Sequence, residues 1–168
     1  MILPEVFLYG MNFVFVEEGG TNTSVTDRGG ITKYGISSKQ YPHLDILNLT
    51  KEDALEIYYR DYWCKLKCEF FPQSLAITIL DSGINCGQPT VAMWLQRSIN
   101  ENNQTLKVDG IIGTKTIKAS REFNSYQLSG RIIGHRVKHY ADLIKKYPDQ
   151  VANIRGWNKR AGNLLLFI

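Results

Sequence analysis

The sequence predicts a mainly α-helical protein with a small β-hairpin near residues 25–36. Helix-starting and helix-ending signals, namely Pro, Thr and Gly at the edges of apolar segments, recur along nearly the whole chain. Strand signals are confined to the glycine-rich stretch at residues 25–36. The chain has 168 residues and is long enough to bury one hydrophobic core. We therefore expect one domain built mainly from helices.

The expected helices follow from their end signals. Pro4 opens a first helix, which the Gly19-Gly20 pair closes. Thr50, with Asp53 three residues later, predicts a capping box that opens a helix through about Trp63. Further helices are expected at residues 74–85 and 90–101, from about 114 with Thr114 as its cap, at 131–147 and at 156–166. The strongly apolar helix at 74–85 is the expected centre of the core.

Charge and cysteine content exclude several classes of protein. The chain carries 20 basic and 16 acidic residues, a net charge of +4, and the basic residues are interleaved with acids. Since no basic stripe results, the sequence does not predict a nucleic-acid-binding protein. The mild positive charge favours approach to an anionic polymer such as a bacterial cell wall. Cys64, Cys68 and Cys86 are odd in number and predict free thiols rather than a disulfide framework or a zinc site.

The apolar N-terminus, MILPEVFLYGMNFVFV, has the features of neither a signal peptide nor a membrane anchor. It lacks a basic first segment and a small-residue cleavage site, and Pro4 and Glu5 interrupt it. It is also too short to span a bilayer. We expect synthesis in the cytoplasm without a signal peptide, and no stable membrane insertion. Any action outside the cytoplasm then requires release or export.

The stretch VEEGGTNTSVTDRGGITKYGIS, residues 16–37, holds the strongest candidates for chemistry. Glu17 and Glu18 end the first helix, and a helical net does not choose which of them faces the core. The acid that faces it lies in a partly apolar setting at a helix C-terminus, and both factors favour its protonated form. A carboxyl protonated near neutral pH is what a general acid requires. The glycines that follow leave space for a bulky ligand.

Asp27 and Thr32 follow on the expected hairpin. A hairpin folded back across the helix end would bring Glu18, Asp27 and Thr32 together around a cleft. Glycoside hydrolysis uses such a set, because one acid protonates the leaving oxygen while a second carboxylate handles water or the oxocarbenium charge. The alternative is a solvated helix end followed by a tight turn, and spacing alone does not exclude it.

These residues resemble the signature of glycoside hydrolase family 108, N-acetylmuramidases that include phage endolysins and secretion activator proteins. The family pattern is E-G-G, then D-x-G-G-x-T, then Y-G-I, and it falls here on residues 18–20, 27–32 and 34–36. The resemblance implies that Glu18, directly before the glycines, is the catalytic acid. The spacing of Glu18, Asp27 and Thr32 is also similar to the Glu/Asp/Thr set of phage lysozymes, which implies analogous roles. Glu17 departs from the pattern, since many relatives carry a basic or polar residue there.

The resemblance continues over most of the chain. IYYRDYW (57–63) is similar to the family's tyrosine-rich helix, LDSGINCG (80–87) to its D-x-x-x-N-x-G helix, and GWNKR (156–160) to its closing motif. WLQR (94–97) with VDGIIGTKT (108–116) is similar to the family's C-terminal region, which resembles peptidoglycan-binding modules. The resemblance thus implies a lysozyme-like, single muramidase domain over residues 1–168. Its catalytic half would be residues 1–87, and its helical, peptidoglycan-binding half residues 88–168.

The activity that the resemblance implies is a bacteriolytic peptidoglycan hydrolase that needs no cofactor or metal. It would cleave the β-1,4 bond between N-acetylmuramic acid and N-acetylglucosamine in glycan strands, and a holin or an export system would bring it to the wall. Two alternatives stay open. One is a lytic transglycosylase, which needs a Glu but no water-directing Asp. The other is a non-catalytic wall-binding or secretion-accessory protein.

Four further residues are candidate substrate contacts: Tyr34, Tyr62, Asp81 and Asn85. Tyr34 adjoins the expected hairpin, and Tyr62 belongs to an aromatic run at 58–63 that would either stack on sugars or fill the core. Asp81 and Asn85 are one turn apart on an otherwise apolar helix. We favour a buried hydrogen-bonded pair that fixes helix packing, and the alternative is a cleft floor that binds sugar hydroxyls.

Two motifs are read as structural. His135 and His139 have the i, i+4 spacing of zinc ligands, but no acid follows His135, and the neighbours Arg136 and Lys138 are basic. We therefore expect a solvated helix face there. VDGIIGTKT contains Gly, Lys and Thr but lacks the G-K-[ST] order of a phosphate loop, so we expect a turn before a helix.

Overall fold

The computed structural model describes residues 2–18, 24–26, 30–102 and 104–168. The expected class is confirmed, since helices dominate and the only sheet in the described residues is small and antiparallel. The chain divides into two compact units, Met1–Asp61 and Tyr62–Ile168. The expected organisation of one muramidase domain with halves at 1–87 and 88–168 stays a prediction.

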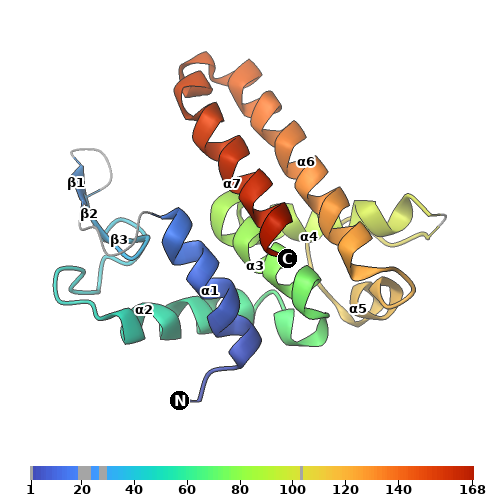
Figure 1. Cartoon of the computed structure of the whole chain (residues 1–168), viewed down its shortest axis with the longest axis horizontal. Coiled ribbons are helices and arrows are strands. Elements are labelled where there is room, and N and C mark those ends of the chain that lie inside the picture. The colour runs from blue at the N-terminus through green and yellow to red at the C-terminus, as the bar shows by residue number, and fades with distance from the viewer. Residues whose placement is uncertain (1, 19–23, 27–29, 103) are drawn as a thin grey trace. The chain divides into compact units, whose positions relative to one another are not determined.

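The first unit contains two helices and the three-stranded sheet β1-β2-β3 (Figure 1). The predicted first helix is confirmed, because α1 follows Pro4 and ends just before Glu18. The capping box at Thr50 is also confirmed, with the Thr50 hydroxyl accepting from the Asp53 N–H at 3.1 Å. The elements are α1 Glu5–Glu17, β1 Ser24–Thr26, β2 Gly30–Lys33, β3 Ile36–Ser37 and α2 Lys51–Tyr58.

A short π-helix at Tyr59–Trp63 continues α2, so the helical segment expected to run to Trp63 does so with its last turn widened. The second unit is otherwise a bundle of helices. Its elements are the 3-10 helix Cys68–Phe70, α3 Gln73–Cys86, α4 Gln88–Asn100, α5 Thr114–Ser120, α6 Ser125–Lys146, the 3-10 helix Pro148–Asn153 and α7 Ile154–Phe167.

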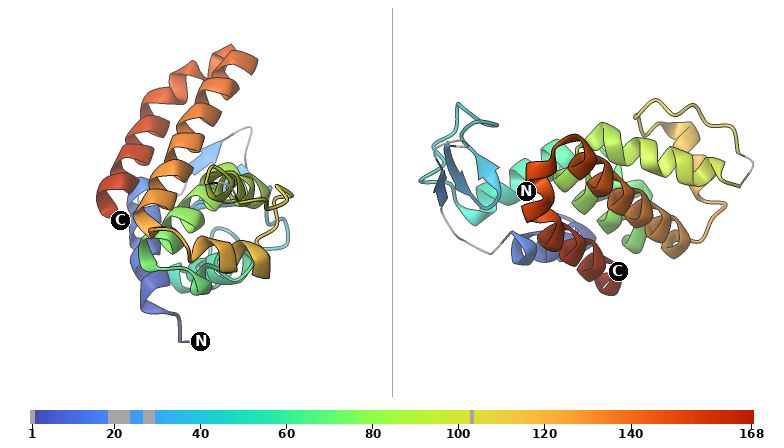
Figure 2. Two further views of the ribbon diagram at one scale, coloured as in Figure 1. Left: turned by 90° about the vertical axis from the view of Figure 1, so that its right-hand side faces the viewer. Right: turned by 90° about the horizontal axis from the view of Figure 1, so that it is seen from above.

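α3 is the centre of the second unit, as its apolar sequence predicts. Every residue from Ser74 to Gly83 is buried, and α3 packs against both α4 and α6. α6 and α7 lie side by side in all three views, joined by the 3-10 helix Pro148–Asn153 (Figures 1 and 2). α3 is therefore covered by neighbouring helices, which leaves its buried polar residues dependent on partners within the bundle.

Several helix starts differ in detail from the prediction. α6 begins at Ser125 rather than near Arg131, because the Asn124 side chain accepts from the N–H groups of Tyr126 and Gln127 and caps the helix there. α5 begins at Thr114, but Thr114 is its first helical residue rather than its cap, which is Gly113. α7 also starts two residues earlier than expected, at Ile154.

Gln96 on α4 holds the loop that contains the VDGIIG motif. Its side-chain oxygen accepts from the N–H groups of Asp109 and Gly110, both at 3.0 Å, and its NH2 donates to the Ile111 carbonyl at 3.0 Å. The side chain is 2% exposed. The two motifs WLQR and VDGIIG are therefore parts of one hydrogen-bonded unit, in which Gln96 of α4 holds the loop in place.

Replacing Gln96 by Met keeps the volume of the side chain but removes every hydrogen bond to this loop. Two backbone N–H groups then lose their acceptor, so the free energy of unfolding should fall by about 1–3 kcal/mol. Urea denaturation measures this change. Gln127→Met is the matched control because Gln127 is exposed on α6, and an equal loss in both variants would contradict the role of Gln96.

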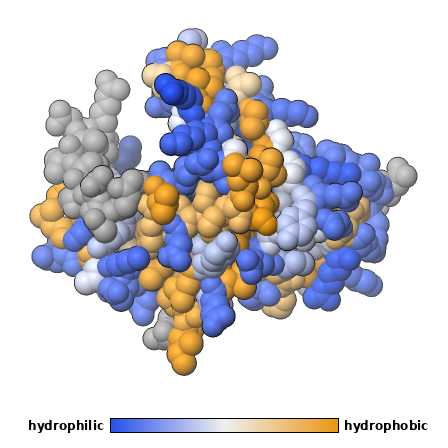
Figure 3. All heavy atoms as spheres, viewed as in Figure 1, coloured by the Kyte–Doolittle hydropathy of each residue, from blue (hydrophilic) through white to orange (hydrophobic). Residues whose placement is uncertain are grey.

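Each helix within the described residues is too short or too polar to cross a membrane. On the face drawn in Figure 3, hydrophobic residues lie among hydrophilic ones. The expected absence of stable membrane insertion stays a prediction about the whole protein.

Candidate functional site

Glu18 lies at the C-terminal end of α1, where its backbone N–H donates to the Val14 carbonyl at 3.0 Å. The helix buries an apolar stripe against the core, and Phe15 is 7% exposed. Glu17 is half-buried, whereas Glu18 is exposed. Glu17 is therefore the more covered of the two acids, and the partly apolar setting expected for the acid that faces the core falls on Glu17 rather than on Glu18.

The turn between β2 and β3 lies directly against Glu18. Tyr34 and Gly35 both have positive φ, 53° and 78°, as a two-residue hairpin turn between the paired Lys33 and Ile36 requires. A Cβ on Gly35 would stand 3.6 Å from Glu18 Cγ and 2.5 Å from the Tyr58 hydroxyl oxygen. The Glu18 side chain thus packs over the backbone of this turn.

Tyr58 ties the turn to α2. Its hydroxyl donates to the Tyr34 carbonyl at 3.1 Å, and its ring is buried. Phe15 completes the contact, with its ring centroid 6.0 Å from that of Tyr34 and 6.2 Å from that of Tyr58, both edge to face. Three elements, α1, the β2–β3 turn and α2, therefore converge where Glu18 leaves the helix.

Thr32 is half-buried on β2, two residues before the Tyr34-Gly35 turn, and pairs with Ser24 on one side and Ser37 on the other. Asp27 lies outside the described residues. The structure therefore brings Glu18 against the turn that contains Tyr34 and places Thr32 on the adjoining strand. The catalytic roles of Glu18, Asp27 and Thr32 and the substrate contact of Tyr34 stay predictions.

Gly35→Ala should lower both the stability and any activity that depends on Glu18. The left-handed φ of 78° disfavours an alanine, and the added methyl group meets the Tyr58 hydroxyl, so the turn must shift away from Glu18. We expect a loss of about 1–3 kcal/mol in stability. Thermal denaturation and cell-wall turbidity assays measure the two effects. Gly113→Ala is the control because its Cβ would have open space, and an unchanged Gly35→Ala protein would contradict this geometry.

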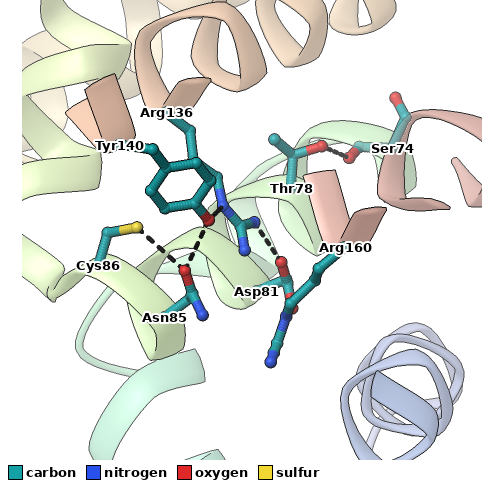
Figure 4. A network of polar contacts seen from close by, with 8 residues as sticks. All are labelled: Ser74, Thr78, Asp81, Asn85, Cys86, Arg136, Tyr140 and Arg160. Atoms are coloured by element: carbon teal, nitrogen blue, oxygen red, sulfur yellow. Dashed lines mark hydrogen bonds and ion pairs between the residues drawn. The ribbon is translucent and has the colours of Figure 1, made fainter. Parts of the chain in front are cut away.

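Asp81 is fully buried on α3 and is held by two arginines (Figure 4). Arg136 of α6 donates from Nη1 to Asp81 Oδ2 at 2.5 Å, and Arg160 of α7 donates to Asp81 Oδ1 from Nη2 at 2.7 Å and from Nε at 3.0 Å. Arg136 is 0% and Arg160 7% exposed. One carboxylate thus joins three helices through charged hydrogen bonds.

Tyr140 and Asn85 extend this cluster toward the surface. The Tyr140 hydroxyl accepts from Arg136 Nε and donates to Asn85 Oδ1 at 2.8 Å. Burial of the phenol raises the pKa of Tyr140 to about 12, so it stays a neutral donor. Burial is the largest single effect on the pKa of Arg136 and lowers it, but the charges and hydrogen bonds of Asp81 and Tyr140 together raise this pKa above its ordinary value.

The geometry supports the packing interpretation of Asp81 more than a sugar-binding one, because both carboxylate oxygens are occupied by arginines. Asn85, in contrast, is exposed at the edge of the cluster, and Tyr62 is half-buried at the start of the second unit. No observation places a sugar on any of the three. Their contact with substrate stays a prediction.

Sequence reasoning missed both arginines of the cluster. The solvated helix face expected around His135 and His139 is wrong at Arg136, which is fully buried. The signal was present: Ile132, Ile133 and Tyr140 lie three or four residues away and are buried, which puts Arg136 on the core-facing side of α6. A charge on such a face requires a buried counterion, and Asp81 is the acid on the buried helix α3.

The two histidines on α6 are also less exposed than expected. His135 is half-buried with Nε2 3.5 Å from Glu101 Oε1, and the His139 ring centroid lies 5.5 Å from that of Trp94. Burial lowers the pKa of both imidazoles. Among the residues that the structure describes, no three His, Cys, Asp or Glu side chains are placed to hold a metal ion. Cys64, Cys68 and Cys86 are free thiols.

Comparison with known proteins gives two family matches. The family described as glycosyl hydrolase 108 matches residues 11–87, and the family described as a predicted peptidoglycan domain matches residues 90–162. Among solved structures, Brucella abortus SagA is similar, with 25% sequence identity and a TM-score of 0.76 over 95% of this chain and 91% of that chain. No curated protein is significantly similar in sequence.

Proposed function

We propose that this chain, whose residues 11–87 match the glycosyl hydrolase 108 family, is an N-acetylmuramidase with Glu18 as its general acid. The predicted peptidoglycan domain at residues 90–162 supports peptidoglycan as the substrate and the cell wall as the place of action. The bond proposed is the β-1,4 linkage that follows N-acetylmuramic acid. A holin or an export system would bring the protein to the wall.

The position of Glu18 is the observation that carries this proposal. Its backbone is fixed by α1, its side chain rests on the Tyr34-Gly35 turn, and the residue is exposed to solvent. A bound glycan would exclude water from the Glu18 carboxyl. Desolvation favours the protonated form, which is the form that donates a proton to a leaving oxygen.

In the proposed reaction, the glycosidic C–O bond breaks as Glu18 transfers its proton to the leaving oxygen. A water molecule adds to the anomeric carbon, and Asp27 accepts the proton that this water loses or stabilises the oxocarbenium charge. Thr32 assists by hydrogen bonding to the water or to Asp27. Because Asp27 lies outside the described residues, its part depends on the family pattern and on its place between β1 and β2.

Incubation of the purified protein with purified peptidoglycan sacculi tests the proposal. We expect soluble muropeptides to be released and the suspension to clear. A protein that sediments with the sacculi but releases nothing would instead be a wall-binding or secretion-accessory protein. That outcome would contradict an enzymatic role.

A further inference from the structure

The second unit contains a cavity of about 430 Å³ that the Glu18 site does not include. Its walls come from the end of the π-helix and the segment after it, the C-terminal end of α3, the start of α4 and the loop at residues 110–112. These walls belong to both family-matched segments, 11–87 and 90–162. The cavity therefore lies where the glycosidase segment and the peptidoglycan segment meet within one compact unit.

The charge of the cavity is positive. Lys65 and Lys67 line it, and none of its lining residues is acidic. Lys67 is half-buried and forms no ion pair with any carboxylate of the described chain. A lysine at a cavity wall that has no carboxylate partner attracts an anionic ligand.

The backbone at Lys67 is also unusual. Its φ of 54° is left-handed, a conformation that costs a residue with a side chain free energy. Such strain persists only where surrounding structure holds it, and here the Lys67 N–H donates to the Cys64 carbonyl at 3.1 Å while Leu66 before it and Cys68 after it are buried. The chain thus holds Lys67 in a fixed place at the cavity wall.

The lining of the cavity contains both apolar and polar residues. Leu66, Ala92 and Ile112 are buried and form its apolar floor, while Tyr62 and Gln88 are half-buried polar residues of the lining. Gly110 has a φ of 76°, and a Cβ there would stand 3.1 Å from the Pro89 carbonyl oxygen, so the loop approaches α4 closely. A ligand that fits has small apolar groups, peptide-like hydrogen-bonding groups and at least one negative charge.

We propose that this cavity binds a carboxylate of the peptide stem of peptidoglycan, with Lys67 as its charge partner and the apolar floor against alanine methyl groups. This inference rests on the proposed function, because it takes peptidoglycan as the polymer. It assigns to the second unit recognition of the peptide rather than of the sugar. Cleavage would then be favoured on strands that still carry their stems.

Binding of a sugar-free peptide tests the site independently of catalysis. The probe is synthetic L-Ala–D-isoglutamate–L-Lys–D-Ala with free carboxylates, titrated into the full chain and followed by calorimetry. Lys67→Met should weaken binding by about tenfold or more, since a charge-assisted hydrogen bond is lost. Lys118→Met, an exposed lysine of α5 outside the cavity, should leave binding unchanged. Lys67→Arg, which keeps the charge, should retain most of the affinity.

Titrations with two other ligands can overturn the inference. The peptide with both carboxylates amidated should not bind, and equal binding of the two peptides would exclude carboxylate recognition. Sodium phosphate that binds as tightly as the peptide would show a general anion site instead. If wild-type protein binds the peptide yet releases no muropeptides, the proposed hydrolase activity fails while this site stands. If it releases muropeptides but does not bind the peptide, the peptide site proposed here is wrong while the proposed hydrolase activity stands.

Discussion

Glu18→Gln should lower the rate of peptidoglycan cleavage by roughly 10²–10⁴-fold, the contribution typical of a positioned general acid. The amide has nearly the same shape as the carboxyl, so the contact of the side-chain carbons with the Gly35 turn is kept. The variant cannot donate the proton that the leaving oxygen needs. Because Glu18 is exposed, the melting temperature should hardly change. Initial rates of sacculus clearing, measured beside thermal denaturation, separate the two quantities.

Glu17→Gln is the matched control for this experiment. It removes the same charge one residue earlier, at a half-buried position on the last turn of α1. We expect clearing within a few-fold of the wild-type rate. A Glu18→Gln protein that clears sacculi as fast as wild type would remove Glu18 from the reaction, and loss of activity only in Glu17→Gln would transfer the assignment to Glu17.

Asp81→Asn should be the most destabilising conservative substitution in the second unit. The amide keeps the size of the carboxyl but leaves Arg136, which is fully buried, without its counterion. Removing one partner of a buried ion pair costs about 3–5 kcal/mol. For a chain of this size that loss corresponds to a fall in melting temperature on the order of 10 °C. Chemical and thermal denaturation should agree on the effect.

The control for Asp81→Asn is Asp142→Asn, because Asp142 is exposed on α6. Its melting temperature should stay within about 2 °C of the wild-type value, since surface substitutions are usually within 0.5 kcal/mol. Kinetics on the folded Asp81→Asn protein also separate the two interpretations of Asp81. If the residue only joins α3 to α6 and α7, KM is unchanged well below the melting temperature. If KM rises strongly while stability is kept, Asp81 contacts substrate and the packing interpretation is wrong.

The elements that the sequence predicts correctly are those with local signals. The start of α1, the capping box of α2 and the hairpin each depend on residues within a few positions of one another, and all three are confirmed. The early start of α6 also has a local signal, the Asn124 cap, but Gly130 lies between this cap and the expected start at Arg131 and disfavours a helix there. Nothing lies within 4 Å of the place of a Cβ at Gly130, so no close contact requires a glycine at this position.

The buried cluster could be predicted only in part. That Asp81 needs a partner follows from its apolar helix, but its arginines lie 55 and 79 residues further along the chain. Pairing across such distances depends on how three helices pack, and a single sequence does not contain that information. The hydrogen bond between the buried Tyr140 and the exposed Asn85 depends on the same packing of helices.

At the candidate site, the family resemblance identified the residue, whereas its surroundings could not be predicted from the sequence. Helix periodicity does not show whether Glu17 or Glu18 is the catalytic acid. The resemblance to the family's E-G-G pattern is what assigns this role to Glu18. The partly apolar setting expected for the acid that faces the core falls on Glu17, whereas Glu18 is exposed. The sequence predicts a hairpin folded back across the helix end, but the contact of Glu18 with Gly35 depends on the left-handed pair Tyr34-Gly35 and on the buried Tyr58, which the sequence alone does not place.

Mass spectrometry of the digestion products tests the central claim most directly. Muropeptides released by the wild-type protein are reduced with borohydride and their ends identified. Our account predicts fragments that end in reduced N-acetylmuramic acid, formed by addition of water after the proton transfer from Glu18. Fragments that end in 1,6-anhydro-N-acetylmuramic acid or in reduced N-acetylglucosamine, or the absence of any fragment, would contradict it.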